Sequence, residues 1–265
     1  MYQLTPWPTL PVPLPVVTPG NSAYARVNDI QLYFSIFGEG EPVILLHGGI
    51  ASGDWWGSQI DFLVDHGYQV IAVDSRGNGR STRSAQPYSY HLMAADVLAL
   101  MDTLSLKRAH IVGWSDGAVI GLDIAIHHPK RLNTLFAFGL NVSPAGVKPG
   151  FDQTDTFLAA AERAQQEYLA LSPTPDEFEA FVAQISHMWR REPNYSDAQL
   201  RSITRPVAIV AAEYDEAIEL DHAAYISATI PTSTWILLRD VSHFAPLQDP
   251  HAFNQAMLSY LEDSL

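Results

Sequence analysis

The chain of 265 residues contains no cysteine. Disulfide bonds, thiolate zinc sites and a cysteine nucleophile are therefore excluded. The chain also has no apolar run near the roughly 18 residues that a membrane-spanning helix needs. No basic residue precedes Arg26, although a signal peptide carries positive charge near its start. The absence of cysteine fits either redox compartment, but from the other two absences we expect a cytoplasmic protein with no membrane span.

Positive charge is scarce, and the formal net charge is −14 at pH 7. Such a field repels the phosphates of nucleic acids and of anionic lipids, so we expect no nucleic-acid partner. The acid excess is greatest between residues 152 and 221, with fourteen Asp or Glu against five Arg and no Lys. This segment is either a solvated acidic surface or a source of preference for neutral or cationic substrates, and both interpretations stay open here.

Short apolar runs alternate with amphipathic segments along most of the chain. The runs within residues 42–49, 68–74 and 108–115 are typical of strands buried on both faces. Residues 24–38 predict a hairpin whose tight turn is Asn28-Asp29. The alternation predicts βαβ units, a mostly parallel sheet and helices on both of its faces.

The first 22 residues form a separate segment that is rich in proline. Proline recurs so often within residues 6–19 that we expect an extended, polyproline-like arm. We expect this arm to lie on the surface of the domain, and a partner-binding motif is the alternative.

The alternation of strands and helices stops at about residue 142. Residues 142–204 predict helices alone. We therefore expect a helical lid, inserted between the core segments 23–141 and 205–265.

Two capping boxes mark helix starts within this insertion, at residues 174–177 and 196–199. The helix after the first box has an apolar, partly aromatic face, which either packs into the core or lines a substrate cavity. The members of this face are Phe178, Phe181, Val182, Ile185, Met188 and Trp189.

A reactive serine stands where a parallel sheet is expected to bind a ligand, at the carboxyl end of a strand. The segment "AHIVGWSDGAVIG" (residues 109–121) passes from a strand through a sharp turn into a helix. Gly113 and Gly117 let the two backbones approach closely, and the central side chain is exposed. Ser115 is therefore the predicted nucleophile. Haloalkane or epoxide chemistry needs an aspartate at that centre, and Asp116 lies one residue beyond it.

A serine nucleophile needs a general base, and the chain has ten histidines. His243 follows the last predicted strand, where a base should stand. His47 precedes two glycines and is interpreted as a group that structures its loop. The others are interpreted as surface or core residues on helices or within a strand: His66, His91, His110, His127, His128, His187, His222 and His251.

The predicted base needs an acid that fixes its tautomer. Asp215 is favoured because it stands where a predicted strand gives way to a loop. Glu213, Glu216 and Asp221 lie nearby and are the alternatives.

A tetrahedral intermediate requires preorganised N–H donors. We expect these from the backbone of Asp116, at a helix start, and of Gly49, with Ile50 next to it. Ile50, Trp114 and Phe244 are candidate substrate-binding residues. The Asp116 carboxylate either complements the helix dipole or faces the pocket and selects substrates that carry an ammonium group.

Taken together, these motifs resemble the α/β-hydrolase superfamily over residues 23–265. Within it, the chain looks like the lid-bearing serine esterases. Its "GWSDG" turn (residues 113–117), here called the elbow, is similar to that of biphenyl-hydrolase-like and valacyclovir-hydrolase-like proteins. Ala212 departs from the pattern, since relatives often have glycine there. The motifs, in the order of the superfamily, are "LLHGG" (45–49), "DSRGNGRS" (74–81), "GWSDG" (113–117), "AAEYDEAI" (211–218) and "VSHFAPLQDP" (241–250).

The resemblance implies an α/β fold with a mostly parallel sheet of about eight strands and a lid after the sixth. It also implies a triad of Ser115, Asp215 and His243, a two-donor oxyanion hole and no cofactor. In the superfamily the segment "DSRGNGRS" shapes the site, so Asp74 and Arg76 are assigned structural roles. We see no clustered His, Asp or Glu that suggests a metal, and no phosphate-binding loop.

The expected activity is hydrolysis of carboxylic esters through an acyl-enzyme. The same triad would serve an enol-lactone, a thioester, a vinylogous diketone that undergoes C–C cleavage, or perhydrolysis, and the sequence does not separate these. A non-catalytic binding protein on the same fold is a further alternative. The expected partner is a small-molecule ester, bound by a monomer or homodimer.

Overall fold

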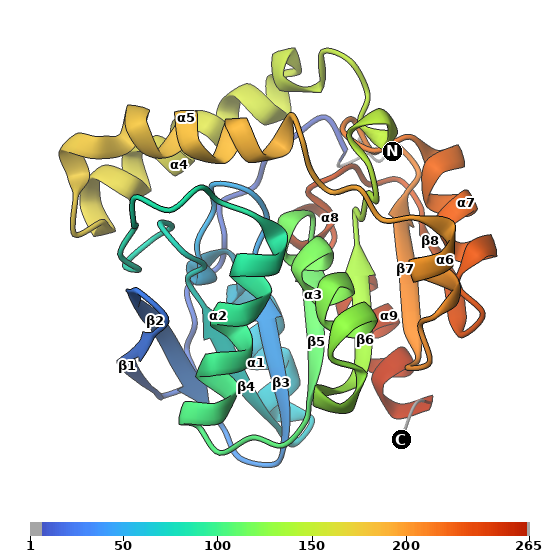
Figure 1. Ribbon diagram of the computed structural model, residues 1–265, viewed down its shortest axis with the longest axis horizontal. Coiled ribbons are helices and arrows are strands. Elements are labelled where there is room, and N and C mark those ends of the chain that lie inside the picture. Colours follow the sequence, from blue (N-terminus) through green and yellow to red (C-terminus); the bar gives the residue numbers. More distant parts are fainter. Residues whose placement is uncertain (1–6, 264–265) are drawn as a thin grey trace, which may run out of the picture.

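The computed structural model describes residues 7–263, which contain one eight-stranded sheet in the order β1-β2-β4-β3-β5-β6-β7-β8. The pairs β1–β2 and β2–β4 are antiparallel, and the pairs from β4 onward are parallel. The predicted fold class is therefore confirmed (Figure 1). The strands are β1 (Gly20–Val27), β2 (Ile30–Phe37), β3 (Glu41–Leu46), β4 (Tyr68–Val73), β5 (Ala109–Trp114), β6 (Leu132–Phe138), β7 (Val207–Ala212) and β8 (Ser233–Leu238).

The predicted hairpin at the edge of the sheet is formed by β1 and β2. Val27 pairs with Ile30, so only Asn28 and Asp29 lie in the turn. Asn28 has a positive φ of 45°, a conformation that asparagine tolerates better than most residues.

Helices cover both faces of the sheet, and each face has its own apolar cluster. Val97 of α2, Val119 of α3 and Ile226 of α7 belong to the first cluster. Ile60 of α1 and Phe253 of α9 belong to the second. Strands β3, β5 and β7 are almost entirely apolar because both of their faces are buried. The core helices are α1 (Gly57–Asp65), α2 (Tyr90–Thr103), α3 (Asp116–His127), α7 (Leu220–Thr229), α8 (Ala245–Gln248) and α9 (Pro250–Asp263).

The helical insertion lies between β6 and β7, as the sequence predicts. It contains α4 (Asp155–Leu171), α5 (Phe178–Trp189) and α6 (Asp197–Arg201). Figure 1 shows α4 and α5 crossing one end of the sheet. Most of the apolar face of α5 packs into the cluster shared with α2 and α3, since Phe181, Ile185 and Met188 are buried there.

One of the two predicted capping boxes is wrong. Thr174 makes no side-chain cap, because its hydroxyl lies 3.3 Å from the hydroxyl of Tyr168. Residues Pro175–Glu177 form a 3₁₀ turn, and α5 begins only at Phe178. The second box forms as predicted, with Ser196 accepting from the N–H of Gln199.

The described part of the proline-rich arm, residues 7–19, is without helix or strand and lies along the domain. Trp7 stacks on Tyr214 with ring centroids 5.1 Å apart. The expected arm extends to residue 22, but β1 already begins at Gly20. Residues 1–6 lie outside the described residues.

Three polar side chains hold the backbone of the arm. Arg163 of α4 donates to the carbonyls of Leu10 and Pro11. Gln248 donates to the carbonyls of Trp7 and Thr9, and Asp61 of α1 accepts from the N–H groups of residues 17 and 18. The arm is thus bonded both to the core and to the insertion.

Among the helices of residues 7–263, each is too short or too polar to cross a membrane.

Candidate functional site

Ser115 lies in the turn between β5 and α3, with φ 54° and ψ −115°. A residue other than glycine adopts this positive φ at a cost, and such strain concentrates at functional sites. A Cβ at Gly113 would lie 2.4 Å from the carbonyl oxygen of Gly117, and one at Gly117 would lie 2.0 Å from that of Leu46. The two flanking glycines are therefore required by close backbone contact, as the motif predicts.

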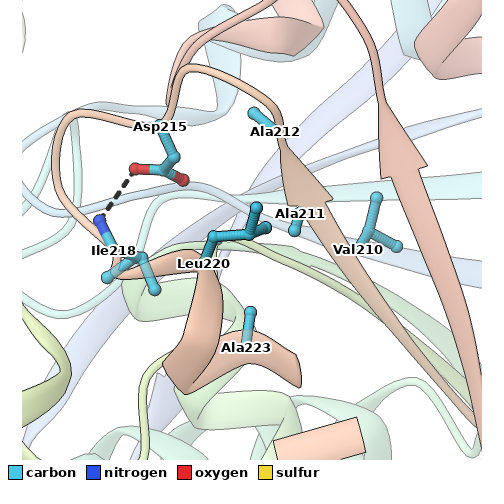
Figure 2. A pocket seen from close by; sticks show the side chains of 8 residues that line it. Val210, Ala211, Ala212, Asp215, Ile218, Leu220 and Ala223 are labelled. Atoms are coloured by element: carbon cyan, nitrogen blue, oxygen red, sulfur yellow. Dashed lines mark hydrogen bonds between the residues drawn. The ribbon is translucent and has the colours of Figure 1, made fainter. Parts of the chain in front are cut away.

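His243 follows β8 and is bonded to the carboxylate of Asp215. Its Nδ1 lies 3.0 Å from Oδ2 and 3.1 Å from Oδ1 of that residue. The N–H groups of Ala217 and Ile218 both donate to Oδ1 at 2.8 Å, so the loop after β7 fixes the carboxylate. Figure 2 shows the bond from Ile218. With Nδ1–H donating to Asp215, Nε2 of His243 is left as a proton acceptor.

The alternative acids have other partners. Glu216 accepts from the backbone N–H of His243 and from the hydroxyl of Thr156. Glu213 pairs with Arg239. Asp215 is thus the carboxylate bonded to the imidazole, although Ala212 stands where relatives often have glycine.

Gly139 brings the imidazole close to the serine. The backbone N–H of Ser115 donates to the carbonyl of Phe138, at the end of the neighbouring strand β6. A Cβ at Gly139, the next residue, would lie 2.7 Å from Cε1 of His243. No hydrogen bond joins the side chains of Ser115 and His243 in the described part of the chain. In free enzymes such bonds are often long and tighten only with substrate bound.

Four aromatic rings surround the imidazole of His243. The ring centroids lie 5.5 Å away for Phe157, 6.0 Å for Phe244, 6.2 Å for Phe138 and 6.4 Å for Trp114. Trp114 and Phe244, which the sequence suggests as substrate-binding residues, are buried and pack edge-to-face on each other. Both therefore support the imidazole. Sequence reasoning missed Phe157, which comes from α4.

Burial alone would lower the pKa of the His243 imidazole, because it disfavours the charged form. The attraction and hydrogen bond of Asp215 outweigh this effect, and Glu216 and Asp116 add to it. The pKa of His243 is consequently raised above its ordinary value. The environment favours the protonated imidazole that would form when the base accepts a proton.

Backbone N–H groups converge beside Ser115. Helix α3 begins at Asp116, and the first N–H groups of a helix have no intrahelical partner. The loop after β3 is adjacent, since a Cβ at Gly48 would lie 3.2 Å from Cβ of Ser115. Gly49 follows with a positive φ of 27°, and Ile50 is half-buried next to it. The predicted oxyanion donors thus belong to segments that meet at the serine.

The carboxylate of Asp116 has a role that the sequence did not reveal. It is buried and accepts hydrogen bonds from the hydroxyl of Tyr90 at 2.7 Å and from the indole N–H of Trp189 at 2.8 Å. Burial raises the pKa of this carboxyl, although both hydrogen bonds oppose the shift. Because both oxygens are bonded within the protein, the carboxylate ties α5 to the elbow, and selection of an ammonium group loses support.

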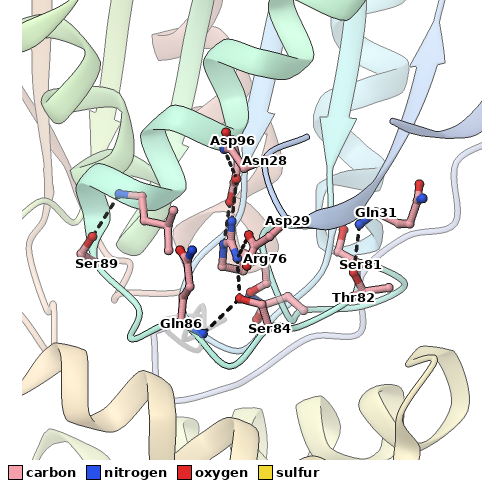
Figure 3. A network of polar contacts seen from close by, with 12 residues as sticks. Asn28, Asp29, Gln31, Arg76, Ser81, Thr82, Ser84, Gln86, Ser89 and Asp96 are labelled. Atoms are coloured by element: carbon pink, nitrogen blue, oxygen red, sulfur yellow. Dashed lines mark hydrogen bonds and ion pairs between the residues drawn. The ribbon is translucent and has the colours of Figure 1, made fainter. Parts of the chain in front are cut away.

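The charged loop after β4 is held by ion pairs. Arg76 is fully buried and bonds Asp96 and Asp29, as Figure 3 shows. Asp74 accepts from the N–H groups of Gly53 and Arg80. Both residues have the structural roles that the resemblance implies. His47, predicted to structure its loop, accepts from the N–H of Ser75 through Nε2.

Comparison with known proteins agrees with this architecture. The family model for the alpha/beta hydrolase fold matches residues 41–158. "Putative carbamate hydrolase RutD" of Caulobacter sp. (strain K31) is 28% identical, over 87% of this chain and 95% of its own length. 3-Oxoadipate enol-lactonase 2 of Acinetobacter baylyi is 26% identical, over 86% of this chain and 92% of its own length.

A solved hydrolase from Pseudomonas aeruginosa superimposes with a TM-score of 0.73 at 25% identity. The match covers 91% of this chain and 98% of that structure. These likenesses extend over most of the molecule, whereas the family model covers residues 41–158. The chain has the alpha/beta hydrolase fold, and the names of the similar proteins given above are those of hydrolases and a lactonase.

Proposed function

We propose that the chain is a serine hydrolase that cleaves carboxylic esters through an acyl-enzyme. In this proposal Ser115 is the nucleophile, His243 the general base and Asp215 the orienting acid. One observation carries it: the strained turn of Ser115 lies beside a histidine that is bonded to a buried carboxylate.

In the proposed reaction Ser115 Oγ attacks the ester carbonyl while Nε2 of His243 takes the hydroxyl proton. The N–H groups of Gly49 and Asp116 hold the oxyanion. His243 then gives the proton to the leaving alcohol, and the ester C–O bond breaks. Water attacks the acyl-enzyme with His243 again as base, which releases the acid and restores Ser115.

We assign the helical insertion the role of a lid over this site. Its support is positional, because Trp189 of α5 bonds Asp116 and Phe157 of α4 packs on His243. The indole of Trp189 also lies beside the proposed oxyanion loop, since a Cβ at Gly49 would be 3.3 Å from its Cζ2. An acyl group at Ser115 would thus meet Trp189 and Ile50.

A second candidate is hydrolysis of a cyclic ester of the enol-lactone type. The enol-lactonase relative supports it, and a lactone carbonyl needs the same nucleophile and oxyanion donors. A carbamate, which the name of the RutD relative indicates, also presents a carbonyl to the serine. A thioester, a diketone and perhydrolysis remain alternatives for the same triad.

The test is turnover of p-nitrophenyl acetate and butyrate by the purified chain and its Ser115→Ala variant. We expect at least a thousandfold loss of kcat in the variant, because the nucleophile and base act as a unit. Ser202→Ala is the matched control, since Ser202 is exposed directly after α6 and its hydroxyl donates to the carbonyl of Gln199. Undiminished turnover in Ser115→Ala would refute the proposal.

A fluorophosphonate probe separates the enzyme from a non-catalytic binding protein. We expect the probe to label Ser115 in the unmodified chain and to leave Ser115→Ala unlabelled. A panel of linear esters, enol-lactones, thioesters and carbamates then ranks the substrate classes by kcat/KM. The ester assignment is abandoned if another class exceeds every ester.

A further inference from the structure

Two histidines and an aspartate converge between α2 and α3, apart from the proposed triad. His91 lies in the first turn of α2, and Asp123 and His127 lie one turn apart on α3. Because residues i and i+4 share a helix face, Asp123 and His127 both face the neighbouring helix. One ligand atom from each of the three residues lies within 4.8 Å of the other two.

We propose that these three side chains form a binding site for a divalent transition metal such as Zn²⁺. The ligands are Nδ1 of His91, the carboxylate of Asp123 and Nε2 of His127. Two imidazoles and one carboxylate suit zinc, whereas Mg²⁺ and Ca²⁺ prefer oxygen ligands alone. Water completes the coordination, because the side chains of His91 and His127 are 67% and 38% exposed.

The distances fit one small ion. His91 Nδ1 lies 3.1 Å from Oδ1 of Asp123, and His127 Nε2 lies 3.8 Å from Oδ2. Tetrahedral zinc with ligand bonds of about 2.0–2.1 Å separates neighbouring ligand atoms by about 3.3 Å. The two measured distances lie within about half an ångström of that separation, and the exposed side chains of His91 and His127 can rotate toward one ion.

The carboxylate at the centre of the site is fixed by an outer contact. Asp123 is buried, and the hydroxyl of Tyr195 donates to its Oδ2 at 2.9 Å. Metal-binding carboxylates are commonly held by such hydrogen bonds, which orient them toward the ion. Tyr195 belongs to the insertion and donates its backbone N–H to Val142. A metal bound at Asp123 would therefore join α2 and α3 at the point where the insertion meets them.

The sequence conceals this site because His91 and Asp123 are 32 residues apart and belong to no metal-binding motif. The arrangement without metal is also plausible chemistry, since Nδ1–H of His91 can donate to the carboxylate. The two states differ in one respect that can be measured. Only the metal site needs both imidazoles at once.

Isothermal titration of the tag-free chain with zinc chloride tests the proposal. We expect one zinc ion per chain, and roughly tenfold or greater loss of affinity in His91→Ala and in His127→Ala. His128→Ala is the matched control, because His128 is exposed beside His127 and lies outside the cluster. Magnesium chloride is expected to give no saturable binding.

Zinc should also raise the unfolding temperature of the unmodified chain, because a ligand that binds only the folded state stabilises it. The double variant His91→Ala/His127→Ala should lose this response while it retains the circular dichroism spectrum of the parent. Absence of saturable zinc binding overturns the proposal. Unchanged zinc affinity in the double variant also overturns it, since zinc would then bind elsewhere. Neither outcome depends on the activity of Ser115.

Discussion

The α/β core and the helical insertion contribute different things to the candidate site. The core supplies Ser115, Asp215 and His243 from turns that directly follow strands or lie close to their ends. The insertion supplies Phe157 and Trp189, which cover these groups through contacts made across long stretches of chain. The difference indicates that the proposed chemistry depends on local backbone geometry, whereas its covering depends on tertiary packing.

The largest expected effect lies on the core side of this comparison. Asp215→Asn should lower kcat on p-nitrophenyl butyrate by about 10⁴-fold, because the amide no longer holds the imidazole in the productive tautomer. Asp221→Asn is the control, since Asp221 was an alternative acid and is exposed on α7. Equal loss in the two variants would contradict the role of Asp215.

On the insertion side, Trp189→Phe removes the N–H that bonds the buried carboxylate of Asp116. We expect a loss of about 1–3 kcal/mol in the free energy of unfolding, the usual cost of leaving a buried acceptor without its donor. Urea denaturation measures it. Trp235→Phe is the matched control, because Trp235 is 39% exposed on β8. If the two variants have the same free energy of unfolding, the contact between α5 and the elbow does not stabilise the fold.

The pH dependence of kcat/KM tests the proposed role of His243 in the core. The base must be neutral to accept a proton, so kcat/KM should fall as pH drops through the raised pKa of His243. This acid limb should therefore lie above the ordinary imidazole value of 6.5. Glu216→Gln removes a charge that raises this pKa, and the limb should move to lower pH. Glu213→Gln should leave the limb in place, and a shift of equal size there would argue against the assignment.

The smallest expected effect compares two helix starts within the insertion. Ser196→Ala should lower the free energy of unfolding by about 1 kcal/mol, because its hydroxyl caps α6. Thr174→Ala should cost less, since Thr174 makes no cap bond. Thermal denaturation of the two variants side by side gives the difference, and the reverse order would contradict the capping geometry.

The core was predictable from the sequence because its signals are local. The glycines around Ser115 lie two residues to either side of it, and the runs that became β3, β5 and β7 are almost entirely apolar. The bonds of Asp116 to Tyr90 and Trp189 were not predictable, because each joins residues far apart in the chain. The same holds for Asp123 and His91.

Residue type alone also misled at Thr174. The pattern of a capping box was present, but the hydroxyl of Tyr168, six residues earlier in the chain, lies against the hydroxyl of Thr174. At Ser196, where the box forms, the hydroxyl and the amide of Gln199 satisfy each other locally. A local pattern is therefore reliable where no group outside the pattern competes for the same atom.

The proline-rich arm has a consequence for how the insertion is held. Arg163 of α4 and Asp61 of α1 both form hydrogen bonds to the backbone of this arm, and the arm is covalently continuous with β1. Its binding is therefore intramolecular, at an effective concentration far above that of any free peptide. Cleavage of the backbone near residue 19 would leave every side chain in place. The arm would then be a separate peptide that binds the domain weakly and can dissociate from it.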